Sequence, residues 1–275
     1  MSLELDVHPN AVAAQISGRD YLSFSSVTAF QRCPLAWKFR YVDSLPEEVV
    51  SASLMLGGAI HSAAEFHFNE LMTGNPAPAL DTLLSVFWDA WRDRGEEATI
   101  RFGRGDDVTT IAKTAERILT AFQQSDMSQP EGDIIGVEEQ LRGELVPGVP
   151  DLLARIDLIV ESADAVTITD LKTARSRWSA GQADDAGEQL LLYGELARDL
   201  IPDKPVRLEF AVITKAAKPV AERWPVVFDA QRVARTKRVV ERTWKAIESG
   251  VFYPAPSPMN CPTCPFRKPC RAWAG

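Results

Sequence analysis

The chain has 275 residues, of which 45% are hydrophobic and 25% charged, a balance that is typical of globular proteins and excludes collagen-like, low-complexity and wholly disordered chains. Its 30 Lys and Arg residues against 38 Asp and Glu give a net charge of −8. That charge argues against a nucleic-acid coat protein, because phosphate contacts need surplus cations. No run approaches the ~18 apolar residues of a membrane span, and no signal peptide is evident. We therefore expect a cytoplasmic chain with reduced thiols and no membrane contact.

The first half of the chain is predicted to be mainly helical. Ser25 or Ser26 can cap a first helix, which Pro34 bends or breaks. Gly57-Gly58 precede a second helix, and residues 73–81 have the composition of a loop. The four expected helices cover residues 27–41, 59–72, 80–94 and 107–125.

The hydrophobic period changes after Pro130, from that of helices to that of strands. Strands are expected over residues 134–145, 152–161, 166–171, 206–214 and 224–228. The first three of them are expected to be consecutive and antiparallel. Helices are expected over residues 187–200 and 230–248, the latter being the last in the chain. The order predicts a mixed α/β core with a helical insertion on its N-terminal side.

Three regions are basic in spite of the acidic total. Residues 21–42 and 249–275 contain no acidic residue, and residues 231–245 carry six cations against Glu241 alone. A solvated helix face and a strip that binds nucleic acid both fit this pattern.

The four cysteines are gathered near the two ends of the chain. They are Cys33, Cys261, Cys264 and Cys270. Disulfides are not expected in a cytoplasmic chain. A zinc site, an iron–sulfur cluster and separately buried thiols all remain compatible with the spacing, since zinc and iron–sulfur clusters both accept four thiolates. A metal held by all four cysteines would staple the two ends of the chain together.

Two carboxylates and an amine are expected at one place on the sheet. In the D-L-K segment, Asp170 and Lys172 share one face of a strand, and Leu171 points to the other. A four-residue turn over 162–165 would place Asp157 directly opposite Asp170. Neighbouring carboxylates repel each other unless a cation lies between them, so this register predicts a site for a divalent cation.

Two helices carry polar side chains at helical spacing. His61 and Glu65 are one turn apart, as are Gln189 and Tyr193, so each pair points in one direction. By itself this spacing also fits the polar rim of an amphipathic helix.

Taken in order, these segments resemble a known family. They read S-V-T-A-F-Q-R-C-P-L-A-W-K-F-R-Y, G-G-A-I-H, R-I-D, D-L-K, Q-L-L-L-Y and C-x2-C-x5-C. The chain resembles the RecB-like branch of the PD-(D/E)xK nuclease superfamily from about Ser25 to Cys270. More narrowly, it is similar to CRISPR-associated RecB-like nucleases and to AddB-type nucleases. The resemblance implies a restriction-endonuclease-like α/β core, a mixed sheet flanked by helices, with a four-cysteine cluster joining the two ends.

The resemblance also implies roles for individual residues. The divalent ion, Mg²⁺ or Mn²⁺, would be held by His61, Asp157, Asp170 and the Leu171 carbonyl, with Glu138 or Glu139 as a further candidate. The catalytic set would be Asp157, Asp170, Lys172, Gln189 and Tyr193. A [4Fe–4S] cluster, with Zn²⁺ as the alternative, would be held by Cys33, Cys261, Cys264 and Cys270. Cations and an indole near the reacting phosphate would come from Arg175, Arg177 and Trp178, although a plain loop explains this segment equally well.

The resemblance implies a metal-dependent DNA exonuclease acting on single strands or DNA ends, in repair or recombination. DNA-end processing in CRISPR adaptation is one alternative, and a non-catalytic DNA-binding module with a structural metal site is another. Helicase, recombination or CRISPR-integration proteins are the expected partners besides DNA. We expect an N-terminal segment over 1–24 and a single nuclease domain over 25–275. Its parts would be a helical portion (25–130), a catalytic core (131–250) and a Cys-rich segment (251–275).

Overall fold

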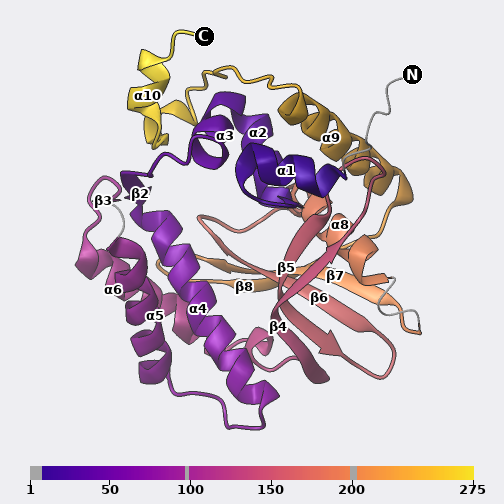
Figure 1. The fold of residues 1–275 in the computed structure, drawn as a ribbon. Helices are drawn as coiled ribbons and strands as arrows, with labels where there is room; N and C mark the ends of the chain where they lie inside the picture. The colour runs from indigo at the N-terminus through magenta and orange to yellow at the C-terminus, as the bar shows by residue number, and fades with distance from the viewer. Residues whose placement is uncertain (1–7, 97–98, 199–202) are drawn as a thin grey trace. The chain divides into compact units, whose positions relative to one another are not determined.

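Helices dominate the first half of the chain and strands its middle, in agreement with the change of hydrophobic period. The computed structural model describes residues 8–96, 99–198 and 203–275 (Figure 1). The helices are α1 (Pro9–Ser17), α2 (Phe24–Arg32), α3 (Pro34–Tyr41), α4 (Ala52–Met72), α5 (Leu80–Gly95), α6 (Val108–Gln123), α7 (Ala180–Ala186), α8 (Glu188–Arg198), α9 (Ala230–Glu248) and α10 (Arg267–Ala272). The strands are β1 (Leu22–Ser23), β2 (Val49–Ser51), β3 (Thr99–Arg101), β4 (Asp133–Gly143), β5 (Leu152–Glu161), β6 (Val166–Ala174), β7 (Val206–Thr214) and β8 (Ala221–Val226).

The chain divides into two compact units. The terminal unit comprises Met1–Glu47, Leu141–Ala154 and Ala230–Gly275. The central unit comprises Glu48–Gln140 and Arg155–Asp229. The four cysteines belong to the terminal unit, whereas the carboxylates, the lysine and the histidine predicted to act together belong to the central unit.

A mixed sheet organises the central unit. Strands β5, β6, β7 and β8 follow one another across it, and β4 pairs with β5. The β5–β6 and β7–β8 pairs are antiparallel, whereas β6 and β7 run parallel. Helices α7 and α8 lie between β6 and β7 in the chain, as a parallel crossover requires. The prediction of a mixed α/β core is therefore confirmed.

Side chains that alternate along the strands pack against helices on the two faces of the sheet. Leu158, Leu171 and Ala211 belong to one core with the apolar faces of α4, α5 and α6, which Figure 1 shows together as one layer. On the opposite face α8 approaches β7 so closely that a Cβ at Gly194 would lie 3.1 Å from Leu208. Leu171 thus points away from Asp170, as the strand alternation predicts.

Two predicted helix starts are wrong. Ser23, rather than Ser25 or Ser26, caps α2, because its extended backbone lets its Oγ accept the backbone N–H of Ser26. Pro34 does mark a break, since it is the first residue of α3 after the extended Cys33. Gly57-Gly58 lie within α4 instead of before it.

The glycines of α4 occupy places where the helix meets its neighbours closely. A Cβ at Gly57 would lie 3.2 Å from Thr173 Oγ1, and one at Gly58 would lie 3.0 Å from Arg94 Nε. Close approach of β6 and α5 therefore explains two residues that disfavour helix formation.

The sequence patterns also miss or misplace shorter elements. Helices α1, α7 and α10 were not expected, and α10 makes the prediction of 230–248 as the last helix wrong. The strand expected over 224–228 runs from Ala221 to Val226 instead. The predicted helix over 187–200 extends to the edge of the residues described. Of the helices described, none combines the length and the apolar composition needed to cross a bilayer.

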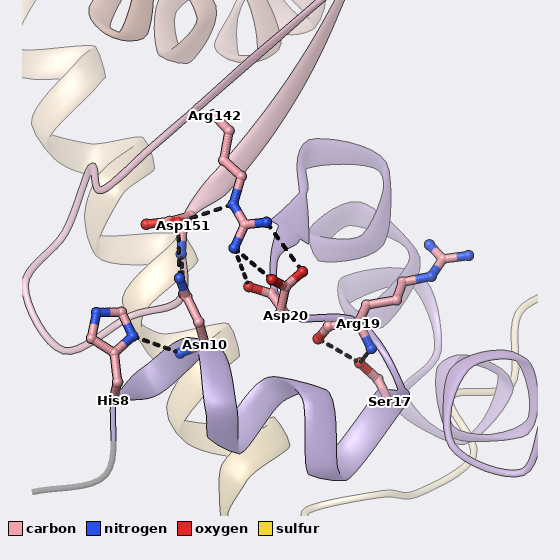
Figure 2. Close-up of polar contacts among 7 residues, drawn as sticks. All are labelled: His8, Asn10, Ser17, Arg19, Asp20, Arg142 and Asp151. Atoms are coloured by element: carbon pink, nitrogen blue, oxygen red, sulfur yellow. Dashed lines mark hydrogen bonds and ion pairs between the residues drawn. The ribbon is translucent and has the colours of Figure 1, made fainter.

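A polar network anchors α1 within the terminal unit (Figure 2). Asn10 and Asp151 exchange two hydrogen bonds of 2.8 Å each. The Arg142 guanidinium donates to Asp151 at 3.0 Å and to the carbonyl of Asp20 at 2.8 Å. Because Arg142 joins two carboxylates that are distant in sequence, it fixes the start of the chain to the β4–β5 connection.

Candidate metal centre

The turn between β5 and β6 sets the register of the predicted carboxylates. Leu158 pairs with Thr169 and Glu161 with Val166, which is the register that a four-residue turn over 162–165 requires. Just beyond the ladder, the backbone N–H of Leu171 donates to Asp157 Oδ2 at 2.6 Å. The register prediction is confirmed, and it brings Asp157 beside the D-L-K segment.

Asp170 is the hub of a polar chain on β6 and α8. Lys172 Nζ lies 2.6 Å from Asp170 Oδ2, and Gln189 Nε2 donates to Asp170 Oδ1 at 3.0 Å. Gln189 Nε2 also lies 3.0 Å from the Tyr193 hydroxyl oxygen, which accepts from it. The Lys172 ammonium therefore compensates the charge of the buried Asp170 Oδ2, and Gln189 holds the other oxygen.

Three side chains gather to form a potential metal site. One ligand atom from each of His61, Glu138 and Asp157 lies within 4.8 Å of the other two. His61 Nδ1 is 3.6 Å from Asp157 Oδ2. Imidazole and carboxylate ligands at this spacing can surround one divalent ion. Glu138 thus joins the group of three, whereas Asp170 lies outside it and Glu139 is exposed.

Glu138 reaches this group through an unusual backbone conformation. Its φ is +52°, in the left-handed region that side chains other than glycine seldom adopt. Arg155 on the adjacent strand β5 lies 3.8 Å from its carboxylate. Strain of this kind is costly and persists where the surroundings impose it, commonly at functional sites.

The pKa values of these groups are shifted, because the side chains are partly buried and several of the charged ones lie close together. Burial, then repulsion from Asp170, raises the pKa of Asp157 to about 7. Burial, then the charge of Asp157, raises the pKa of Glu138. Burial lowers the pKa of His61, which favours the neutral imidazole that binds metals. Burial raises the pKa of Tyr193 to about 12, so this residue remains a neutral phenol. A divalent cation would relieve the repulsion between the carboxylates.

The group of three opens into a cleft of about 640 Å³ in the central unit. Lys172 and Glu65 line the same cleft, so His61 and Glu65 do face one space. Its walls also carry cations that no sequence pattern singled out, Arg94 and Lys215. Lys215 Nζ donates to the carbonyl of Ser53 at 3.0 Å. The lining thus combines acidic groups with cations, and the cations suit a substrate that is a polyanion.

The four cysteines line one cavity of about 210 Å³ in the terminal unit. Cys33 separates α2 from α3, and the other three lie on the C-terminal segment. Backbone N–H groups point at two of the sulfurs, from Ala255 to Cys33 at 3.5 Å and from Ser257 to Cys261 at 3.2 Å. All four are free thiols, and no three of these described Sγ atoms lie within 4.8 Å of one another.

Comparison with known proteins decides the family. The family model of the PD-(D/E)XK nuclease superfamily matches residues 21–271, nearly the whole chain. The chain belongs to the PD-(D/E)XK nuclease superfamily. The expected superfamily is therefore confirmed.

One solved structure agrees with this PD-(D/E)XK chain on the fold. The chain is similar to a crystal structure of a “putative exonuclease” from Eubacterium rectale, with 16% sequence identity and a TM-score of 0.56 over 99% of this chain and 93% of that one. A crystal structure of SSO0001 matches with 13% identity over 80% of this chain and 84% of that one, but its TM-score of 0.35 supports no argument. Among curated proteins, none matches this chain.

The three residues expected to contact DNA after β6 differ in their surroundings. Arg177 pairs with Glu222, and Trp178 packs edge-on against Phe210 with ring centroids 5.2 Å apart. Arg175 is exposed. A role for these residues in holding DNA stays a prediction.

Sequence reasoning missed how this PD-(D/E)XK site is completed. Glu138 was one of two candidates, and the structure brings its carboxylate to His61. Arg94 and Lys215 carry no signal in their own segments, because three-dimensional proximity alone places them in the cleft. The glycine pair of α4 was the available hint, since it marks where α5 and β6 come close.

Proposed function

We propose that the protein is a deoxyribonuclease that depends on Mg²⁺ or Mn²⁺. The observation that supports this most strongly is the convergence of His61, Glu138 and Asp157 on one point, beside the Asp170–Lys172 ion pair. Crowded carboxylates favour a divalent cation, and the adjacent ammonium can stabilise a second negative charge. Membership of the PD-(D/E)XK superfamily makes phosphodiester hydrolysis the expected chemistry.

The donor set fits a hard divalent ion. His61, Glu138 and Asp157 would hold it, with Asp170 and the Leu171 carbonyl as the further ligands that the family resemblance implies. When bound, Mg²⁺ or Mn²⁺ supplies Lewis-acid polarisation of the phosphate and a water of lowered pKa. Carboxylates suit both ions, whereas the imidazole favours Mn²⁺.

The protein side chains provide the rest of the catalytic machinery. Lys172 is fixed by its ion pair with Asp170, so its ammonium can orient the attacking water and offset the charge that grows on the phosphate. Gln189 holds the other oxygen of Asp170 and is itself held by Tyr193. The Tyr193 phenol stays neutral, because burial raises its pKa to about 12, and its oxygen accepts the hydrogen bond that holds Gln189 in place.

We infer that single-stranded DNA or DNA ends are the substrate and that the mode is exonucleolytic. The family resemblance and the description of the Eubacterium rectale protein support this choice. The cations that line the cleft, Arg94 and Lys215, would contact phosphates of the bound strand. End processing in CRISPR adaptation uses the same chemistry and would need partner proteins.

We further propose that the four cysteines hold a [4Fe–4S] cluster. They line one cavity, and the sulfurs of Cys33 and Cys261 accept backbone N–H groups, as cluster ligands do. A zinc ion held by the same four thiolates is the alternative.

The test is a digest of end-labelled single- and double-stranded DNA with Mg²⁺, Mn²⁺ or a chelator. We expect metal-dependent cleavage, abolished in Asp170→Ala with its fold intact, as judged by circular dichroism. The matched control is Asp164→Ala, an exposed residue of the β5–β6 turn. Metal-dependent DNA binding without cleavage in any arm would instead establish a non-catalytic DNA-binding module.

A further inference from the structure

The terminal unit contains a groove that the proposed catalytic site does not use. It has a volume of about 550 Å³ and is lined on one side by α9 and on the other by the segment around the α2–α3 junction. The residues that characterise it, here called the basic groove, are Phe30, Pro34, Arg235, Arg238, Arg242 and Tyr253.

Three arginines form a row along the basic groove. Arg235, Arg238 and Arg242 are exposed and spaced by three and four residues, so they share one face of α9. At a rise of about 1.5 Å per residue, the row is about 10.5 Å long. Stacked nucleotides advance about 3.4 Å each along a strand, so the row matches about three phosphates.

The described residues that line the basic groove include no acidic side chain, although the whole chain has a net charge of −8. Glu241, the one acid among residues 231–245, forms an ion pair with Lys245. Guanidinium groups gathered in this way on an acidic protein are complementary to a phosphate backbone.

An exposed aromatic ring lies beside the arginines. Tyr253 is 53% exposed, which is unusual for so large a side chain, and its backbone carbonyl is held by the N–H of Leu35 at 3.0 Å. Phe30, by contrast, is buried against Trp37 and Phe252 and forms the floor. A ring held on a fixed backbone next to guanidinium groups can stack on an unpaired base. It cannot stack in this way on the bases of a duplex, which are already stacked on each other.

We propose that the basic groove binds single-stranded nucleic acid, with phosphates on the α9 arginines and a base on Tyr253. The assignment of the basic groove as a site for the DNA substrate rests on the proposed nuclease function. It adds a second point of contact with DNA, outside the catalytic cleft. Arginine and an aromatic ring are the residue types that bind strands without reading their sequence. The groove therefore holds the strand and does not select its sequence.

The test measures binding in the absence of cleavage. The full chain is titrated against a fluorescent 20-nucleotide oligo-dT in EDTA, and anisotropy is followed over a series of salt concentrations. We expect Arg238→Gln/Arg242→Gln to bind at least tenfold more weakly, with a salt slope lower by about 1.4, because two phosphate contacts are lost. Tyr253→Leu should weaken binding of oligo-dT more than binding of a hairpin duplex.

The matched control is Arg104→Gln/Lys113→Gln, which changes the charge equally at two exposed residues of the central unit. Thermal unfolding confirms that each variant is folded. Unchanged affinity and salt slope in the groove variant overturn the proposal, and an acidic protein partner then becomes the better occupant. Equal loss in the control also overturns it. If the wild type binds DNA through the groove but cleaves none with Mn²⁺, the nuclease proposal fails and the groove stands.

Discussion

The pKa of Asp157 makes the affinity for metal depend on pH in a calculable way. Burial and Asp170 raise this pKa to about 7, and the carboxylate must lose its proton before it can bind an ion. With a pKa of 7, about one tenth of the molecules are ionised at pH 6 and about nine tenths at pH 8. We therefore expect Mn²⁺ to bind about tenfold more tightly at pH 8 than at pH 6, a difference of about 1.4 kcal/mol.

The same shift predicts how the metal-free fold responds to pH. The folded state holds a proton on Asp157 more tightly than the unfolded chain, whose pKa is near 3.8. The contribution of this group to stability therefore falls as pH rises from about 4 to about 7. Mn²⁺ offsets that loss, so it should raise the melting temperature more at pH 8 than at pH 6.

Isothermal titration calorimetry in buffers of different ionisation enthalpy measures both the affinity and the proton released. About 0.9 proton per ion should appear at pH 6 and about 0.1 at pH 8, from the ionised fractions. Asp157→Asn should bind weakly at every pH, and Asp164→Asn should follow the wild type. An affinity that stays constant from pH 6 to pH 8, with no proton released, would refute the assignment of Asp157 as a ligand.

Three further predictions address the surroundings of the site and the fold. Gln189→Ala and Tyr193→Phe should lower kcat about 10- to 100-fold in steady-state cleavage without changing the Mn²⁺ affinity, because Gln189 donates to Asp170 and Tyr193 accepts from Gln189. An unchanged kcat in both variants would exclude the two residues from the mechanism. Gly132→Ala should lower the free energy of unfolding by about 2 kcal/mol, because Gly132 has a φ of +126° and its new Cβ would lie 2.4 Å from a backbone oxygen. Gly105→Ala should lower the free energy of unfolding by only about 1 kcal/mol, because Gly105 has a φ of +81° but open space around it. Urea titrations measure both variants. Equal losses of stability in the two would contradict the steric clash assigned to Gly132→Ala. Protein purified without oxygen should be brown and contain about four iron atoms per chain. In any Cys→Ala variant, the brown colour and the melting temperature should both decrease. Colourless protein with bound zinc would contradict the cluster.

Local patterns were sufficient for the register of β5 and β6 and for the direction of two side chains of α8. The short turn over 162–165 fixes the strand register, and the register then carries Asp157 to the D-L-K segment without help from the rest of the fold. The spacing of Gln189 and Tyr193 likewise fixes their direction, and the structure joins the two by a hydrogen bond.

The remainder depends on contacts that no local pattern records. Gly57-Gly58 indicated a helix boundary by propensity, but the packing of α4 against its neighbours outweighs that propensity. Glu138 and Glu139 are equal candidates in the sequence, and the structure brings the Glu138 carboxylate to His61 and leaves Glu139 exposed. Ser23 competes with two following serines for the start of α2, and its own extended backbone, at the end of β1, settles the choice.

The central claim is that Lys172 acts in chemistry beside a metal held by His61, Glu138 and Asp157. It is tested most directly by single-turnover cleavage of end-labelled DNA by Lys172→Gln, alongside calorimetric Mn²⁺ binding by the same protein and by the exposed control Lys113→Gln. We predict that Lys172→Gln binds Mn²⁺ at least as tightly as the wild type and cleaves at least a hundredfold more slowly. Wild-type cleavage by Lys172→Gln would contradict the claim.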